Sequence, residues 1–322
     1  MLIPRYWSES WQTLRVGKNS TRLRRFGWSS ESQQAADQHA RERLQEAIRA
    51  IQSGTKIRER EDKIPYNGAD GLPIREEIVA EHPNAVITRN SYGALCLNTP
   101  NVLFADIDFP EDSSGVADKL LPVLFFCGLL GGNLLKISWL IIGGLICLGL
   151  YAIIKIYRRL WIHQIETQYT RCMNALEEFA ARHPQYRFIA YQTPAGFRLL
   201  FLHALYDPRS PEVKAIFQEL KVDPQYARMC HNQACFRARL TPKPWRMGMK
   251  NRFSRPAVWP VQEKLQPKRK ALLEEYNQRA GSYAACRFLK EWGEKNAADP
   301  TALGIQQLHD DLAHARTDLP LA

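Results

Sequence analysis

The sequence lacks the cysteine pattern that marks a disulfide framework or a zinc knuckle. Its seven cysteines are an odd number, and Cys127 and Cys147 fall within apolar segments, which favours a reducing compartment. Cys230 and Cys235 in the stretch CHNQAC are further apart than the cysteine pairs of zinc knuckles, and no second Cys/His pair follows at a matching distance. The N-terminal stretch MLIPRYWSES also lacks the charged start and continuous apolar core of a signal peptide. Composition therefore disfavours a disulfide-rich secreted protein and a zinc knuckle.

Acidic residues are in the minority, and none occurs between Pro224 and Gln262. The chain of 322 residues has 44 Lys and Arg against 33 Asp and Glu, a formal net charge of +11. This excess suggests an anionic partner, which can be a nucleic acid, a nucleotide or a lipid surface. The length allows one large domain or two ordinary ones.

Basic and aromatic residues alternate within the segment that has no acid. Its members are Phe236, Arg237, Arg239, Lys243, Trp245, Arg246, Lys250, Arg252, Phe253, Arg255 and Trp259. Basic side chains between aromatic rings suit a phosphate backbone with stacked bases. We therefore predict that Arg239, Trp245 and Arg246 contact nucleic acid. The alternatives are a solvated loop and a patch that faces anionic lipid.

Two apolar runs occupy the middle of the chain, Leu120–Leu135 and Ile137–Ile154, with Lys136 between them. A membrane span needs about 20 apolar residues and at least roughly 17. With a turn at residues 131–133, the pattern predicts two short spans in a hairpin over 119–157, and hence an integral membrane protein in contact with the bilayer. One tilted span with a re-entrant half is the alternative. The basic flank Lys155–Trp161 predicts that the soluble segments lie on the cytoplasmic side.

Periodicity in the remaining segments predicts an α+β fold, an antiparallel (RRM-like) sheet with flanking helices. Helices are expected over 32–51, 158–184, 210–223 and 267–296, and strands over 84–109 and 187–203. The predicted organisation has four parts: 1–118, the hairpin 119–157, 158–262 with the basic stretch, and a helical segment 263–322.

Two aspartates, Asp106 and Asp108, interrupt the apolar strand NVLFADIDFP. Residues two apart on a strand point to the same face, so the two carboxylates would lie side by side. A hard divalent cation is the usual way to hold such a pair. The alternative is a strand face that is simply solvated.

The order of three short motifs resembles the catalytic core of archaeo-eukaryotic primases and primase-polymerases. FADIDF is similar to the paired acids of that family, TPAGFRLLF to its small-Gly-x-His strand hairpin, and VDPQYARMCHNQACFRARLTPK to its third acid with basic positions after it. The resemblance covers roughly Ala85 to Lys243, less the apolar runs. Arg198 stands where the family has a nucleotide-contacting histidine, and His203 has the wrong strand parity to replace it.

This resemblance implies a two-metal nucleotidyltransferase. Asp106, Asp108 and Asp223 would hold Mg²⁺ or Mn²⁺, and Arg198, Arg237 and Lys243 would contact phosphates of a nucleoside triphosphate or of single-stranded nucleic acid. The predicted function is thus a membrane-anchored nucleotidyltransferase or its degenerate relative. The alternative is a non-enzymatic integral membrane protein whose basic soluble domain binds nucleic acid or anionic lipid.

Overall fold

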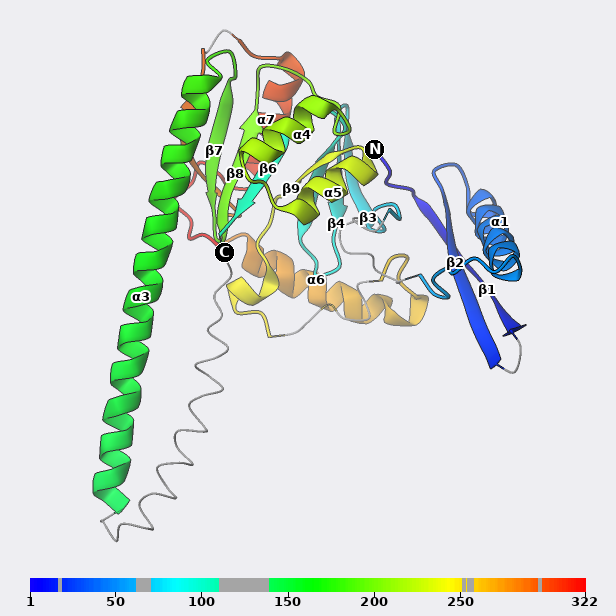
Figure 1. Ribbon diagram of the computed structural model, residues 1–322, viewed down its shortest axis with the longest axis horizontal. Coiled ribbons are helices and arrows are strands. Elements are labelled where there is room, and N and C mark those ends of the chain that lie inside the picture. Colours follow the sequence, from blue (N-terminus) through cyan, green and yellow to red (C-terminus); the bar gives the residue numbers. More distant parts are fainter. Residues whose placement is uncertain (17–18, 62–70, 110–138, 251–252, 254–257, 295–296) are drawn as a thin grey trace. The chain divides into compact units, whose positions relative to one another are not determined.

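The computed structural model describes residues 1–16, 19–61, 71–109, 139–250, 253, 258–294 and 297–322 (Figure 1). The chain forms two compact units, one made of Met1–Ile107 with His183–Ala322 and the other of Asp108–Arg182. The fold is α+β with antiparallel sheets, as the periodicity predicted.

The N-terminal segment forms a long hairpin covered by a helix. β1 (Tyr6–Val16) pairs with β2 (Asn19–Ser29) along their whole length, and α1 (Gln33–Gln52) packs against both. The helix begins where Ser32 accepts a hydrogen bond from the backbone N–H of Ala35 at 3.1 Å. Gly27 allows the close approach, because a Cβ there would lie 2.1 Å from the backbone nitrogen of Ala40. The helix was predicted from the sequence, whereas the hairpin was not.

The rest of the first unit contains two four-stranded sheets. One has the order β3-β4-β5-β9, with β3 (Glu77–His82), β4 (Ala85–Arg89), β5 (Leu95–Thr99) and β9 (Phe236–Arg239) all antiparallel to their neighbours. The other has the order β10-β7-β8-β6, with β6 (Phe104–Asp108), β7 (Phe188–Thr193), β8 (Gly196–Phe201) and β10 (Arg287–Trp292). The segment predicted as a helix over 267–296 is α6 (Gln266–Ala280) followed by strand β10, so that prediction was wrong in its second half.

Tyr226 joins the edge strands β6 and β9 of the two sheets. It lies on α5 (Pro224–Gln233), and its hydroxyl is 3.0 Å from the carbonyl oxygens of Phe104 and of Arg237. The same hydroxyl accepts a hydrogen bond from the backbone N–H of Arg237 at 3.2 Å. Polar groups of two sheet edges are thereby satisfied by one half-buried side chain. Two further helices, α4 (Pro211–Glu219) and α7 (Pro300–Leu312), complete the unit.

The second unit carries α3 (Trp139–Arg182), a single helix of 44 residues. The second predicted membrane span lies at its start, and the first, Leu120–Leu135, lies outside the described residues. Among the residues that the structure describes, no helix is both long and apolar enough to cross a membrane. Within the described part of α3, the apolar residues end at Ile154 and the charged part of the same helix begins at Lys155. The prediction of a transmembrane hairpin over 119–157, and of an integral membrane protein with it, was therefore wrong.

Candidate functional site

Asp106 and Arg198 form a bidentate ion pair between the neighbouring strands β6 and β8. Arg198 Nε donates to Asp106 Oδ1 at 2.8 Å and Nη2 to Oδ2 at 3.3 Å, while Nη1 donates to the carbonyl oxygen of Arg239 at 2.7 Å. Arg198 is only 2% exposed. Burial alone would lower the pKa of its guanidinium, but the attraction of Asp106 outweighs burial and leaves this pKa above its usual value. Both groups that were predicted to meet metal and phosphate are thus bonded to each other.

The other two predicted metal ligands are arranged differently. Asp108 is exposed at the end of β6. The carboxylate of Asp223 caps α5, because it accepts hydrogen bonds from the backbone N–H groups of Gln225 at 3.2 Å and Tyr226 at 3.1 Å. Its own backbone N–H donates to the carbonyl oxygen of Asp106 at 3.2 Å, so the third motif does lie beside the first. Within the described part of the chain, no group of three His, Cys, Asp or Glu side chains is placed to hold a metal ion.

Arg237, predicted to contact phosphate, lies in the core of the β3-β4-β5-β9 sheet. Its Nη2 donates to both carboxylate oxygens of Glu76, at 2.7 and 2.6 Å, and its Nη1 to Asn98 Oδ1 at 2.9 Å. Thr88 also donates to Glu76, at 2.6 Å, and Asn98 donates to Thr88 at 3.0 Å. The network is closed and buried, so its function is to satisfy charge inside the sheet rather than to meet a ligand.

A cluster of four residues lies next to this core, with Trp245 exposed and the other three half-buried, and we call it the basic–aromatic strip. It consists of Tyr92, Arg239, Lys243 and Trp245. Trp245 is 58% exposed, with Lys243 Nζ 5.5 Å from its ring centroid and the Tyr92 ring edge-on at 5.4 Å. Arg239 Nη1 reaches the Tyr92 hydroxyl at 3.4 Å, and the Arg239 carbonyl accepts from buried Arg198.

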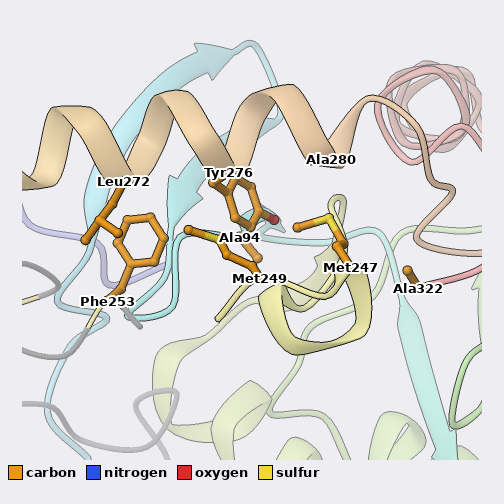
Figure 2. Close-up of a cluster of buried hydrophobic side chains, with 8 residues drawn as sticks. All are labelled: Ala94, Met247, Met249, Phe253, Leu272, Tyr276, Ala280 and Ala322. Atoms are coloured by element: carbon orange, nitrogen blue, oxygen red, sulfur yellow. The ribbon is translucent and has the colours of Figure 1, made fainter. Parts of the chain in front are cut away.

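The loop that carries Trp245 is held rigidly from below. The 3-10 helix η2 (Pro244–Met247) starts at a proline and ends at Gly248, whose φ of 69° is one that glycine adopts readily. Figure 2 shows the side chains that anchor it, with Met247, Met249 and Phe253 gathered beneath Leu272 and Tyr276 of α6. The Tyr276 hydroxyl bonds Thr241 Oγ1 and the Pro242 carbonyl, both at 2.7 Å.

Tyr92 is held by the same cluster. The turn after β4 places Gly93 at a φ of 92°, and a Cβ there would lie 2.8 Å from the ring of Phe253. Two hydrogen bonds to the side-chain oxygen of Asn90, from the N–H groups of Tyr92 at 3.1 Å and Ala94 at 3.0 Å, close this turn. The strip therefore stands on a fixed base. Arg246, the remaining predicted nucleic-acid contact, is half-buried within η2.

The structure also shows a cluster that the sequence did not reveal. Cys286 Sγ lies 3.7 Å from His309 Nε2, and His309 Nδ1 lies 3.1 Å from Asp310 Oδ1, the order of a thiol nucleophile with its base and orienting acid. Cys286 and His309 are both fully buried, and burial raises the pKa of the Cys286 thiol to about 12. A thiol that is protonated and closed off from solvent is inert, so this cluster belongs to the core.

No family model matches the chain, and no curated protein or solved structure matches it either. The resemblance to primases therefore depends on the three short motifs alone.

Proposed function

We propose that this protein binds single-stranded nucleic acid on the basic–aromatic strip and that it does so without phosphoryl-transfer chemistry at Asp106. The observation that carries the proposal is the surroundings of Trp245, a ring that is 58% exposed, fixed from below, and bordered by a lysine and a tyrosine. Every base has a flat face that can stack on such a ring, and the cations that would meet phosphates are Lys243 beside the ring and Arg239 beside the neighbouring Tyr92.

The arrangement of the acids supports binding rather than catalysis. A nucleotidyltransferase site with Mg²⁺ or Mn²⁺ would need Asp106 to leave Arg198 and Asp223 to leave the cap of α5. Leaving Arg198 buried without its carboxylate costs several kcal/mol, and metal binding would have to exceed that cost. We therefore propose binding of nucleic acid without catalysis at Asp106.

Anionic lipid explains the strip less well. Basic residues near a charged membrane act as separate point charges worth about 1 kcal/mol each, and their effect needs no aromatic ring at a defined distance. The close association of Lys243 and Tyr92 with one exposed indole supports a ligand that stacks.

The test is fluorescence anisotropy of a labelled oligothymidylate with the full chain. Stacking of one base is worth about 1 to 3 kcal/mol, so Trp245→Ala should weaken binding roughly 5- to 150-fold, whereas Trp245→Phe should retain most of the affinity. Lys243→Ala should reduce the slope of log affinity against log salt by about 0.7, the value for one phosphate contact on a single strand.

Lys290 provides a matched control. Its Nζ lies 5.2 Å from the ring of Trp292, as Lys243 lies over Trp245, but Trp292 is only 9% exposed and cannot stack on a base. Lys290→Ala should leave the affinity unchanged. Absence of binding at low salt, or equal losses in Lys243→Ala and Lys290→Ala, would refute the proposal. Metal-dependent nucleotide incorporation that disappears in Asp106→Asn would replace it with the enzyme.

A further inference from the structure

The N-terminal hairpin has one face covered by α1 and a second face that is buried near Trp7 and Phe26 but open toward the turn. Strand residues alternate between faces, and Gly27, Leu23 and Leu14 lie on the face that packs against α1. Trp7, Glu9, Trp11 and Thr13 of β1 lie on the other face, opposite Trp28, Phe26, Arg24 and Arg22 of β2 in that order. This face thus carries aromatic residues near Trp7 and arginines toward the turn of the hairpin.

Near the ends of the strands at Trp7 and Trp28, the cationic side chains pair with acidic and carbonyl groups of the protein itself. Arg24 Nη1 lies 3.7 Å from Glu9, and its Nη2 donates to the carbonyl oxygen of Glu61 at 2.6 Å. Arg43, whose guanidinium lies 4.6 Å from the Trp28 ring centroid, pairs with Glu61 at 2.7 Å. These cations are bound within the fold.

Toward the turn of the hairpin the arrangement changes. Trp11 is 53% exposed, and the guanidinium of Arg22 is stacked over its ring at 3.8 Å from the centroid. Within the described part of the chain, neither Arg22 nor Arg15 is within ion-pair distance of an acidic side chain, and both are exposed. The two strands together contain four arginines and one glutamate, and that glutamate is the one paired with Arg24. The exposed positive charge is therefore concentrated beside the exposed tryptophan.

We propose that the open face of the hairpin, at Trp11 and Arg22, is a second binding site for single-stranded nucleic acid. The placement of the site rests on the hairpin alone, and the choice of ligand rests on the proposed function. A guanidinium whose carbon lies 3.8 Å from an indole centroid brings planar N–H donors to the ring, and such donors suit a phosphate. The uncovered area of the Trp11 ring offers a stacking surface for a base. An acidic peptide would use the arginine but would not require a flat aromatic ring.

The experiment maps contacts on the unmodified full chain and then tests them by substitution. An oligothymidylate of about 20 nucleotides with 4-thiothymidine at intervals is longer than a single site of roughly 4 to 16 nucleotides, and is crosslinked by near-ultraviolet light. The adducts are then located by mass spectrometry. We expect adducts in two peptides, one with Trp11 and one with Trp245. Adducts only in the Trp245 peptide would overturn the second site and leave the proposed function standing, and adducts only in the Trp11 peptide would do the reverse.

Substitutions then measure the contribution of the hairpin. Trp11→Ala should weaken binding of the same oligonucleotide roughly 5- to 150-fold, and Arg22→Lys, which keeps the charge but loses the planar stack, should fall between the wild type and Arg22→Ala. Gln12→Ala is the control, since Gln12 is exposed on the neighbouring position of β1 and points to the other face. Wild-type affinity in both Trp11→Ala and Arg22→Ala would refute the site, and so would an equal loss in Gln12→Ala. Anionic vesicles that bind through Trp11 and Arg22 in place of the oligonucleotide would also refute it.

Discussion

Replacing Asp106 by alanine tests whether its carboxylate stabilises the fold or serves as a metal ligand. Arg198 is only 2% exposed. Of the hydrogen-bond acceptors described above for its guanidinium, this change leaves the carbonyl oxygen of Arg239. Removing one partner of a buried ion pair costs about 3 to 5 kcal/mol, because the remaining charge is left without compensation. The side chain of Asp106 is 27% exposed, so water can partly replace it, and we expect the lower end of that range.

Two companion variants resolve the origin of this cost. Asp106→Asn keeps one acceptor oxygen for Arg198 and loses the charge, so it should cost about 1.5 to 3 kcal/mol. Adding Arg198→Met to Asp106→Ala removes the stranded charge, and the double variant should be more stable than Asp106→Ala alone. Asp318→Ala, at an exposed carboxylate, is the control and should change stability by less than about 0.5 kcal/mol.

The assay is urea denaturation followed by both circular dichroism and tryptophan fluorescence. Two probes are needed because a chain of two compact units can unfold in more than one step, and coincident transitions justify a single free energy of unfolding. If Asp106→Ala is as stable as the wild type, or more stable, the carboxylate is not committed to Arg198. A rise in melting temperature with Mg²⁺ that is lost in this variant would then establish the metal site that the motifs predicted.

Two further predictions concern the packing of α1 and the acid stability of the core. Gly27→Ala would place a Cβ 2.1 Å from the backbone nitrogen of Ala40, so the hairpin and helix must separate, with a loss of about 3 kcal/mol or more; an unchanged thermal melting temperature would contradict this. Burial lowers the pKa of His309 below its ordinary 6.5, with nearby Arg198 acting in the same direction against the opposing influence of Asp310. As the pH falls through about 6.5, His309 is therefore protonated in the unfolded chain before it is protonated in the folded chain, so the free energy of unfolding should decrease. The urea midpoint of His309→Leu should depend less on pH in this range.

Elements with a clear local period could be predicted from the sequence. Ala36, Ala40, Leu44 and Ala47 recur at helical spacing, and they are the buried face of α1. The strands of 84–109 and the hairpin of 187–203 also form where alternation and turn residues predicted them. The N-terminal hairpin was not predicted because the face that carries Trp7 and Trp11 also carries charged and polar residues, among them Glu9, Thr13 and Arg22. Neither face then reads as simply apolar or polar, and the signal of a half-buried strand is lost.

The apolar run before Lys155 was misjudged for a related reason. Hydropathy alone does not distinguish a short span from the start of a longer helix, and the continuation of α3 through Lys155 to Arg182 is visible only when the charged part is included in the same element. The periodicity of residues 158–184 predicts a helix there, but it does not reveal that this helix continues back to Trp139.

Proximity in the candidate site was easier to predict than the function of each charge. The motifs do bring Asp106, Arg198 and Asp223 together, yet the partner of each group depends on strand pairing and helix capping between segments far apart in the sequence. Arginines that look equivalent in the sequence therefore have different roles, depending on whether they are buried or exposed. Arg198 and Arg237 form ion pairs with carboxylates of the sheets, so their charges are neutralised within the fold.

The same division decides which part of the net charge of +11 can act on a ligand. Within the residues that the structure describes, two places combine an exposed tryptophan with a neighbouring cation, Trp245 with Lys243 and Trp11 with Arg22. Long-range attraction of an anion depends on the whole charge and weakens with salt, whereas stacking at these two rings does not. If the affinity for the oligonucleotide does not change with salt but decreases on substitution of Trp245 or Trp11, most of the affinity comes from stacking on these rings. The reverse result would assign it to the diffuse charge of the chain and would leave neither tryptophan with a role in recognition.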